Sequence, residues 1–254
     1  MLLAVDVGNT QTHFGTFDEG GRLVEHWRFA TVRTSTADEL GAALRNLVEL
    51  RGVGLADLDA SIVSSTVPAL EPEWTRMARR YLDHEPLVVG PGLRTGMAIR
   101  YDNPREIGAD RLVNAVAIKE RWGGPAICVD FGTAVNFDVV SAAGEYLGGV
   151  LAPGVDISLD ALTERGARLP KIDLAPPRNV IGKSTVEAIR SGVIFGYAAL
   201  VDGIIERIWE ELGEAPTVAT GGLAGHIVPF CRTISEVDDL LTLSGLRLLH
   251  ERNQ

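Results

Sequence analysis

The chain has 254 residues, of which 46% are hydrophobic and 23% are charged, so it can bury a substantial core as one large or two moderate domains. Its formal net charge of −10 disfavours nucleic acid as a partner, because proteins that bind DNA or RNA usually cluster Lys and Arg against the phosphates. The two cysteines, Cys128 and Cys231, are far apart and lack zinc-ligand spacing, which indicates a reduced cytoplasm.

Two apolar stretches are candidates for a membrane or export signal. The N-terminal run reaches Asp6 after five residues, which is too short for a secretory signal. The run at residues 193–205 is interrupted by Asp202 and is shorter than a membrane span. We therefore expect a cytoplasmic protein with no membrane anchor.

The first half of the chain predicts a succession of strands and helices. In chain order these are strands at 2–7, 10–17 and 22–31, a helix capped by Thr36, a strand at 61–67, a helix at 71–81, a strand at 86–89 and a helix at 108–121. Each predicted strand carries an apolar or alternating run, and the first helix carries Leu40, Leu44, Leu47 and Val48 at helical spacing.

The second half repeats this order of elements. It predicts strands at 126–129, 135–140 and 145–151, helices at 157–164 and 185–211, a strand at 217–220, and helices around Gly225 and near the C-terminus. Such a repeat predicts an α/β fold of two similar domains that face one another across a cleft. The helix stop at residues 122–125 places the boundary between a domain at 1–122 and a domain at 123–254.

The turn after the first strand reads Asp6-Val7-Gly8-Asn9-Thr10. Its glycine lets backbone N–H groups come close to a phosphate, and hydroxyls follow at Thr10 and Thr12. A carboxylate at the end of a buried strand can hold a magnesium ion through water, and Asp6 is the candidate. A plain Asx-type hairpin turn is the alternative for this motif taken alone.

Two further glycine turns stand at corresponding places. Asp130-Phe131-Gly132-Thr133 ends the first strand of the second half and offers another carboxylate and hydroxyl, so two such hairpins could grip the β- and γ-phosphates of a nucleotide. Thr220-Gly221-Gly222 follows a short strand and could pack on a purine ring. Ordinary strand-to-helix connectivity explains this last turn equally well.

Together these motifs resemble the phosphate and adenosine motifs of the acetate and sugar kinase, Hsc70 and actin superfamily. The block at residues 101–111, Tyr-Asp-Asn-Pro-Arg-Glu-Ile-Gly-Ala-Asp-Arg, is similar to the block that marks type III pantothenate kinases. Similarity continues at residues 64–68, 148–149, 153–154, 181–185 and 241–246, and so covers nearly the whole chain. The resemblance implies two actin-like (ribonuclease H-like) domains with a nucleotide cleft between them.

The resemblance also implies an activity: ATP-dependent phosphorylation of pantothenate on its primary hydroxyl to 4'-phosphopantothenate, the first step of coenzyme A biosynthesis. It implies a homodimer, Mg²⁺ with the ATP, and a monovalent cation, K⁺ or NH₄⁺. The long apolar helix at 184–211 could bury one face against a second subunit.

Carried over residue by residue, the resemblance assigns the site as follows. Asp110 is the general base, which agrees with the need of a neutral alcohol for a carboxylate that takes its proton. The implied ATP-binding residues are Asp6, Val7, Gly8, Asn9, Thr10, Gln11, Thr12, His13, Thr133, Gly221 and Gly222. The implied pantothenate-binding residues are Tyr101, Gly108, Ala109, Asp110, Arg111 and Thr185, and Asp130 is the implied ligand of the monovalent cation.

Simpler explanations exist for several of these residues. Asp110 could merely cap its helix and pair with Arg111, and Arg111 could form a surface salt bridge. His13 on an alternating strand is more often a packed or surface side chain than a catalytic one. Other acidic residues are better explained by helix capping or a solvated surface than by metal binding: Asp156, Asp160, Asp238 and Asp239.

One departure from the family pattern concerns the second phosphate motif. The family commonly continues with threonines, whereas Val135 and Asn136 follow Ala134 here, which leaves the shape of the phosphate and cation pocket open. Two other functions also stay open: a kinase of the same superfamily with another hydroxyl substrate, and a regulator that senses nucleotide without turnover. A carboxylate at position 110 favours the kinases, because a sensor needs no base.

Overall fold

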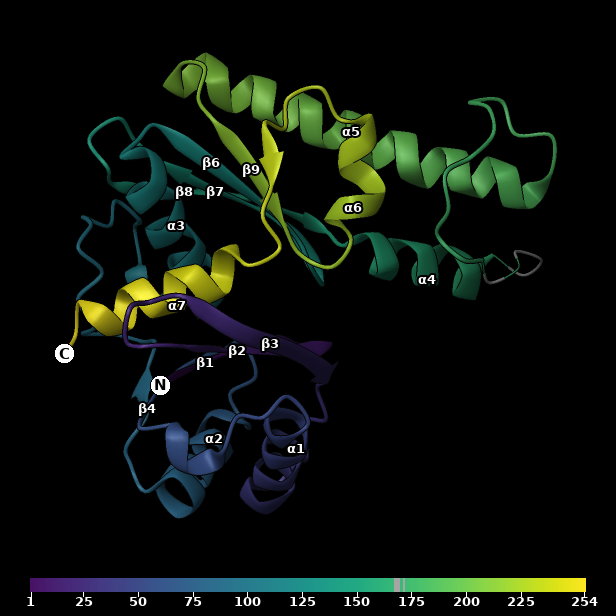
Figure 1. Ribbon diagram of the computed structural model, residues 1–254. Coiled ribbons are helices and arrows are strands. Elements are labelled where there is room, and N and C mark those ends of the chain that lie inside the picture. The colour runs from purple at the N-terminus through teal and green to yellow at the C-terminus, as the bar shows by residue number, and fades with distance from the viewer. Residues whose placement is uncertain (167–169, 171) are drawn as a thin grey trace. The chain divides into compact units, whose positions relative to one another are not determined.

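The computed structural model describes residues 1–166, 170 and 172–254, and their helices and strands are drawn in Figure 1. Contacts divide these residues into two compact units. The first unit comprises Met1–Met97, Asp102–Ala117 and Leu241–Gln254; the second comprises Ala98–Tyr101 and Ile118–Leu240. The division predicted at residues 122 and 123 had assigned the last helix to the second domain, whereas its contacts group it with the first unit.

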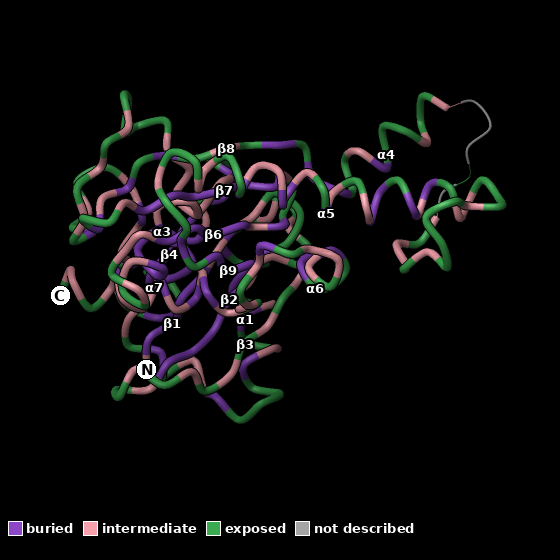
Figure 2. The backbone as a smooth tube through the Cα atoms, turned by 90° about the horizontal axis from the view of Figure 1, so that it is seen from above, coloured by how far each residue is buried: buried purple, intermediate pink, exposed green. Residues whose placement is uncertain are grey.

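The first unit is built on a mixed five-stranded sheet in the order β3-β2-β1-β4-β5. Its strands are β1 (Leu2–Val7), β2 (Gln11–Phe17), β3 (Leu23–Ala30), β4 (Ala60–Ser65) and β5 (Leu87–Val88). β1 pairs antiparallel with β2 and parallel with β4. β1 is therefore the central strand, and Figure 2 shows it buried along most of its length.

One face of this sheet packs against helices α1 (Ala37–Glu49) and α2 (Glu71–Met77). Leu3, Val5 and Phe14 form a core with residues of both helices. Thr36 begins α1 as predicted: its side chain accepts a hydrogen bond from Glu39 N, and the Glu39 side chain accepts one from Thr36 N. α2 is shorter than the predicted helix at 71–81, because the chain continues from residue 78 as a π turn and ends at a left-handed Asp83.

The last helix, α7 (Leu241–Glu251), also belongs to the first unit and contacts β1, β4 and β2. A Cβ on Gly15 of β2 would lie 2.9 Å from the Leu243 side chain, so α7 lies directly on the sheet. A Cβ on Gly245 would lie 2.4 Å from the carbonyl oxygen of Val113 in α3 (Ala109–Trp122). α7 therefore packs against the first half of α3, the helix that carries the predicted base Asp110.

The second unit repeats the topology of the first, in the order β10-β9-β6-β7-β8. Its strands are β6 (Ala126–Phe131), β7 (Ala134–Val140), β8 (Tyr146–Pro153), β9 (Thr217–Thr220) and β10 (Glu236–Val237). β6 pairs antiparallel with β7 and parallel with β9, as β1 pairs with β2 and β4. The predicted repeat and the α/β fold class are therefore confirmed; β10, of two residues, was not predicted from the sequence.

Helices α4 (Val155–Arg165), α5 (Thr185–Leu212) and α6 (Ala224–Ile227) complete the second unit. α5 is long and apolar enough to cross a membrane, but a single helix of this kind is weak evidence of a membrane span. Ile194, Val201 and Ile205 are fully buried and pack against the sheet, so α5 is a core helix of this unit.

Asp202, the acidic residue in the apolar part of α5, anchors the segment that follows α6. Its carboxylate accepts hydrogen bonds from Arg232 N, Thr233 N and the Thr233 hydroxyl at 2.9, 3.1 and 2.8 Å, and it pairs with Arg232 Nε at 3.1 Å. Burial would raise the pKa of Asp202, but these hydrogen bonds outweigh it and hold the pKa below its ordinary value.

We expect Asp202→Ala to lower the free energy of unfolding by about 3 kcal/mol, because buried donors lose a charged acceptor. Thermal and urea unfolding at pH 7 would measure this loss. The loss should shrink as the pH falls through the lowered pKa of Asp202, because the native carboxylate is then protonated as well. An unchanged midpoint would show that these hydrogen bonds add nothing to stability.

Candidate functional site

The first glycine turn joins β1 to β2 in the first unit. Gly8 N donates to the carbonyl oxygen of Gln11 at 3.1 Å, and a Cβ on Gly8 would lie 2.9 Å from that oxygen. Only glycine fits such a close approach of the backbone without displacing the turn. Asn9 and Thr10 lie exposed at its tip, and Arg33 donates to Asn9 Oδ1 at 3.0 Å.

The side chains on either side of this turn differ in their exposure to solvent. Asp6 is partly buried on β1 and lies directly across from His13 on β2. Thr12 is buried, and its hydroxyl shares a hydrogen bond of 2.9 Å with the Thr31 hydroxyl. Gln11 is exposed. The turn thus presents backbone, Asn9 and Thr10 to solvent, while the Thr12 hydroxyl is directed into the unit.

His13 is partly buried, and its Nε2 shares a hydrogen bond of 3.2 Å with His26 Nδ1. Burial, followed by the charges of Arg28 and His26, lowers the pKa of His13 from 6.5 to about 3. His13 is therefore neutral near pH 7. A neutral imidazole that is hydrogen-bonded to a second histidine is typical of a packed side chain, and the implied contact of His13 with ATP stays a prediction.

Folding lowers the pKa of His13, so below pH 6.5 the unfolded chain binds a proton at this residue, whereas the folded chain binds it only near pH 3. We therefore expect the free energy of unfolding to fall as the pH drops below 6.5. At pH 5 this contributes about 1–2 kcal/mol of destabilisation. Urea unfolding of wild type and His13→Gln at pH 7 and pH 5 measures it, with the exposed His226→Gln as the control. Equal losses of stability in wild type and His13→Gln would contradict this account.

Asp110 lies in the first turn of α3, in the first unit. Its Oδ1 atom accepts a hydrogen bond from Arg111 N at 2.9 Å. A Cβ on Gly108 would lie 2.6 Å from the same oxygen, so the glycine makes room for the carboxylate. Burial raises the pKa of Asp110, and it prevails over the Arg111 N–H and the Arg111 charge, which lower the pKa. A carboxyl with a raised pKa is better matched to a proton-accepting role near neutral pH.

The rest of the predicted substrate block is distributed over the chain. Gly108, Ala109 and Arg111 flank Asp110 in the first unit, whereas Tyr101 belongs to the second unit. Thr185 also belongs to the second unit and is exposed at the start of α5, after Ser184, whose hydroxyl accepts from Glu187 N at 3.2 Å. The structure therefore brings four of the six predicted substrate residues together in one unit.

The second glycine turn and the adenosine motif meet within the second unit. Asp130 pairs with Thr220 across β6 and β9. A Cβ on Gly221 would lie 2.5 Å from Asp130 Oδ1 and 2.7 Å from the Phe131 backbone, and Gly221 has a φ of +95°. Gly222 beside it has open space. Only glycine satisfies both demands at position 221, so the two motifs pack directly against each other.

Two residues at this site had no predicted role. A Cβ on Gly154 would lie 2.2 Å from the Thr133 carbonyl oxygen, so the start of α4 packs directly on the second phosphate turn. Asn136 lies across from Asp130 on β7. It is buried, and its Oδ1 atom has no hydrogen-bond partner among the described residues. Its departure from the family pattern was the one signal in the sequence that pointed to it.

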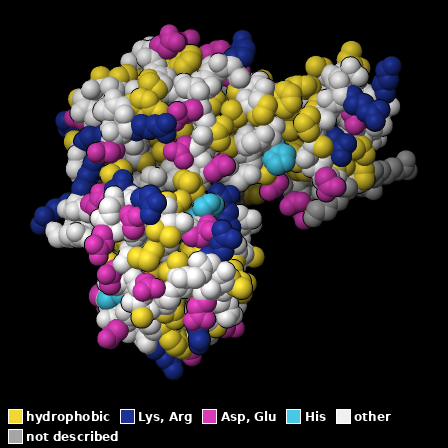
Figure 3. Space-filling view, viewed as in Figure 1, with side chains coloured by type: hydrophobic (Ala, Val, Ile, Leu, Met, Phe, Trp, Pro, Cys, Tyr) yellow, Lys and Arg dark blue, Asp and Glu magenta, His cyan; other side chains and the backbone are white. Residues whose placement is uncertain are grey.

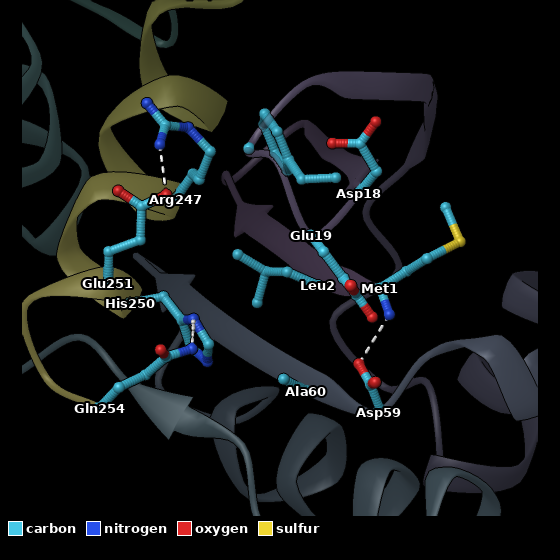
Figure 4. Close-up of a pocket in the computed structure, with 12 residues that line it drawn as sticks. Met1, Leu2, Asp18, Glu19, Asp59, Ala60, Arg247, His250, Glu251 and Gln254 are labelled. Atoms are coloured by element: carbon cyan, nitrogen blue, oxygen red, sulfur yellow. Dashed lines mark hydrogen bonds and ion pairs between the residues drawn. The ribbon is translucent and has the colours of Figure 1, made fainter.

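A pocket of about 320 Å³ lies elsewhere in the first unit, where the N-terminus meets α7 (Figure 4). Its lining contains none of the predicted site residues. The Met1 amine pairs with Asp59 at 2.7 Å, and Arg247 pairs with Glu251. Both cationic groups named here therefore have an acidic partner within the pocket lining.

Comparisons with known proteins define the class of this fold. The chain is similar to the activator of 2-hydroxyisocaproyl-CoA dehydratase from Clostridium difficile with bound ADPNP, at a TM-score of 0.59 and 12% identity over 99% of this chain and 95% of that chain. It is also similar to a ROK family glucokinase from Streptomyces griseus in complex with glucose and AMPPNP, at a TM-score of 0.54 and 13% identity over 98% of each. The fold is therefore that of the acetate and sugar kinase, Hsc70 and actin superfamily.

The family within this class follows from sequence. The family model for type III pantothenate kinase matches residues 2–207. The type III pantothenate kinase of Anaeromyxobacter sp. (strain Fw109-5) is 54% identical over 255 residues, which cover 100% of both chains. The chain belongs to the type III pantothenate kinase family. Its activity is that of an ATP-using pantothenate kinase in coenzyme A biosynthesis, as the sequence predicted.

Proposed function

We propose that Asp110 is the general base that accepts the proton of the primary hydroxyl of pantothenate as this oxygen attacks the γ-phosphorus of ATP. The observation that carries the proposal is the setting of its carboxylate: Gly108 leaves space for it, Arg111 N orients it, and burial raises its pKa. In the transfer the hydroxyl oxygen forms a bond to the γ-phosphorus, the bond to the β,γ-bridging oxygen breaks, and ADP leaves.

The glycine turns would hold the nucleotide. The turn at residues 6–13 would bind phosphate oxygens through its backbone N–H groups, with Asn9 and Thr10 at its tip. Thr133 would donate its hydroxyl to a phosphate. Gly221 and Gly222 would offer a flat backbone surface to the adenosine, which the fit of Gly221 against the second turn supports.

Arg111 and Tyr101 would bind pantothenate, with Gly108, Ala109 and Thr185. A guanidinium can pair through two hydrogen bonds with the carboxylate of pantothenate, and Arg111 follows the base directly in sequence. Its partly buried position strengthens such a pair relative to one in open solvent.

The donor set at the second phosphate turn fits a monovalent cation. Asp130 offers a carboxylate, and the buried Asn136 Oδ1 is an oxygen acceptor that lacks a hydrogen-bond partner among the described residues. Hard oxygen ligands suit K⁺ or NH₄⁺. When bound, such a cation would neutralise phosphate charge. Asp6, at the end of β1, would hold Mg²⁺ through water.

We also propose a cytoplasmic homodimer. Several large apolar side chains of the second unit are exposed, and Figure 3 shows hydrophobic side chains at the surface of the region of α4 and α5. The exposed apolar residues of this unit include Leu151, Ile157, Leu162, Val180 and Ile181. A second subunit would cover them. Light scattering at micromolar concentration tests this, and a monomeric mass would rule the dimer out.

The product of the reaction tests the proposed function. Incubation with magnesium-ATP and pantothenate, followed by ³¹P NMR, should show a phosphate monoester on the primary hydroxyl together with ADP. Ester formation with other hydroxy acids but not with pantothenate would overturn the proposed substrate. Binding of ATP with no ester would indicate a nucleotide-sensing protein instead.

A further inference from the structure

Residues 98–101 lie along the start of β8, in the second unit. Ile99 forms a parallel bridge with Tyr146. Tyr146 N donates to the carbonyl oxygen of Ala98 at 2.9 Å, and Arg100 N donates to the carbonyl oxygen of Tyr146 at 2.8 Å. Arg100 also pairs with Glu145 at 2.6 Å. These contacts hold residues 98–100 beside β8, and they thereby fix the position of the Tyr101 backbone, which follows directly.

The ring of Tyr101 rests on Gly148 of β8. A Cβ on Gly148 would lie 3.0 Å from Tyr101 Cδ2 and 3.1 Å from Cε2, which is closer than about nine in ten real Cβ contacts, so the ring would have to move. Gly148 also has a φ of +109°, which L residues rarely adopt. Position 148 therefore demands glycine both for its own backbone and for the place of the Tyr101 ring.

A second ring fixes Tyr101 from beside Gly148. The rings of Tyr101 and Tyr146 are 6.2 Å apart between centroids, with an angle of 35° between their planes. Tyr146 is fully buried, and its hydroxyl donates to Asp138 Oδ1 at 2.9 Å. Asp138 is itself fully buried on β7. A hydrogen bond to a buried carboxylate is strong, so Tyr146 offers a rigid surface.

We propose that Gly148, with Tyr146 held by Asp138, is a positioning residue for pantothenate: it sets the place of the Tyr101 ring. The inference rests on the proposed function, because that function assigns Tyr101 to the substrate. Gly148 makes no contact with the phosphates in this account. Its replacement therefore weakens the binding of pantothenate and leaves the binding of ATP unchanged, since small displacements of a binding group cost affinity steeply.

Gly148→Ala tests the inference, with Gly213→Ala as the matched control. Gly213 also has a positive φ, +86°, and open space around it, so its replacement imposes the backbone strain without the clash. We expect Gly148→Ala to raise KM for pantothenate by about tenfold and KM for ATP by less than about twofold. Gly213→Ala should change neither. Equal rises in both KM values for Gly148→Ala would overturn the inference.

A double-mutant comparison separates action through Tyr101 from a general loss of structure. In a Tyr101→Ala background, Gly148→Ala should raise KM for pantothenate no further, because the ring that it displaces is already absent. Additive effects would overturn the inference. If Gly148→Ala does not fold, Tyr146→Phe serves in the same comparison, because it frees the Tyr146 ring from Asp138 alone.

A measurement without substrate distinguishes this inference from the proposed function. The chain has four tyrosines, so the ring resonances of Tyr101 can be assigned in protein labelled at tyrosine. They should shift in Gly148→Ala and stay unchanged in Gly213→Ala. An unmoved Tyr101 resonance would overturn the inference even in an active kinase, whereas a shifted resonance in a protein inactive toward pantothenate would overturn only the proposed function.

Discussion

Asp110→Asn should lower kcat with pantothenate by about 10²–10⁴-fold, the usual contribution of a general base, while KM for ATP changes little. The amide keeps the shape of the carboxylate and can still accept from Arg111 N, but it cannot take the hydroxyl proton. Steady-state kinetics of ADP release measures the loss. Asp156→Asn, an exposed acid in the first turn of α4, is the control and should keep full activity.

The same substitution should stabilise the protein near neutral pH. The folded state raises the pKa of Asp110 above its ordinary value of 3.8, so the ionised carboxylate costs stability above the folded pKa, and this cost disappears as the pH falls below 3.8. Asp110→Asn removes the charge. A higher melting temperature at pH 7 together with lost activity would indicate a carboxylate kept for function. A lower melting temperature together with full activity would indicate a helix cap instead.

Gly221→Ala should abolish ATP binding or weaken it by more than about tenfold, and it should also lower the melting temperature by several degrees. A methyl group at this position meets Asp130 Oδ1 at 2.5 Å and the Phe131 backbone at 2.7 Å. The backbone there is also strained for any L residue, because φ is +95°. The adenosine motif and the second phosphate turn must therefore separate, and calorimetry with ATP measures the result.

Gly222→Ala is the matched control, one residue away with nothing within 4 Å of its Cβ position. It should keep the fold, and any loss of ATP affinity should be much smaller than for Gly221→Ala. Equal losses in both variants would indicate that bare backbone at the adenosine contact matters more than the fit of Gly221 against Asp130.

The elements of the fold were predictable because each half of the chain carries strong local patterns. Leu3, Val5 and Val7 alternate toward one face of β1, and Ile127, Val129 and Phe131 do the same in β6. β10 was not predicted, because Glu236 and Val237 form no apolar run of the kind that marks β5, and their strand is set by parallel pairing with β9. The end of α2 was also misplaced, because the chain stays helical beyond Met77 but continues as a π turn with wider i→i+5 hydrogen bonds.

The residues of the candidate site could be proposed from the sequence only where a motif is continuous along the chain. The glycine turns and Asp110 fall within short blocks, whereas Gly154 meets Thr133, and Gly148 meets Tyr101, through pairing between distant segments. The return of α7 to the first unit is of the same kind, because it depends on contacts with β1. Periodicity carries no information on such contacts.

Release of ADP that depends on pantothenate tests the central claim most directly. The assay would use wild-type protein with magnesium-ATP, with and without pantothenate, in potassium chloride and in choline chloride of equal ionic strength. We expect release only with pantothenate, and faster release in potassium. Release that is the same without pantothenate, or absent in both salts while ATP binds, would contradict the assignment of this site as a pantothenate kinase.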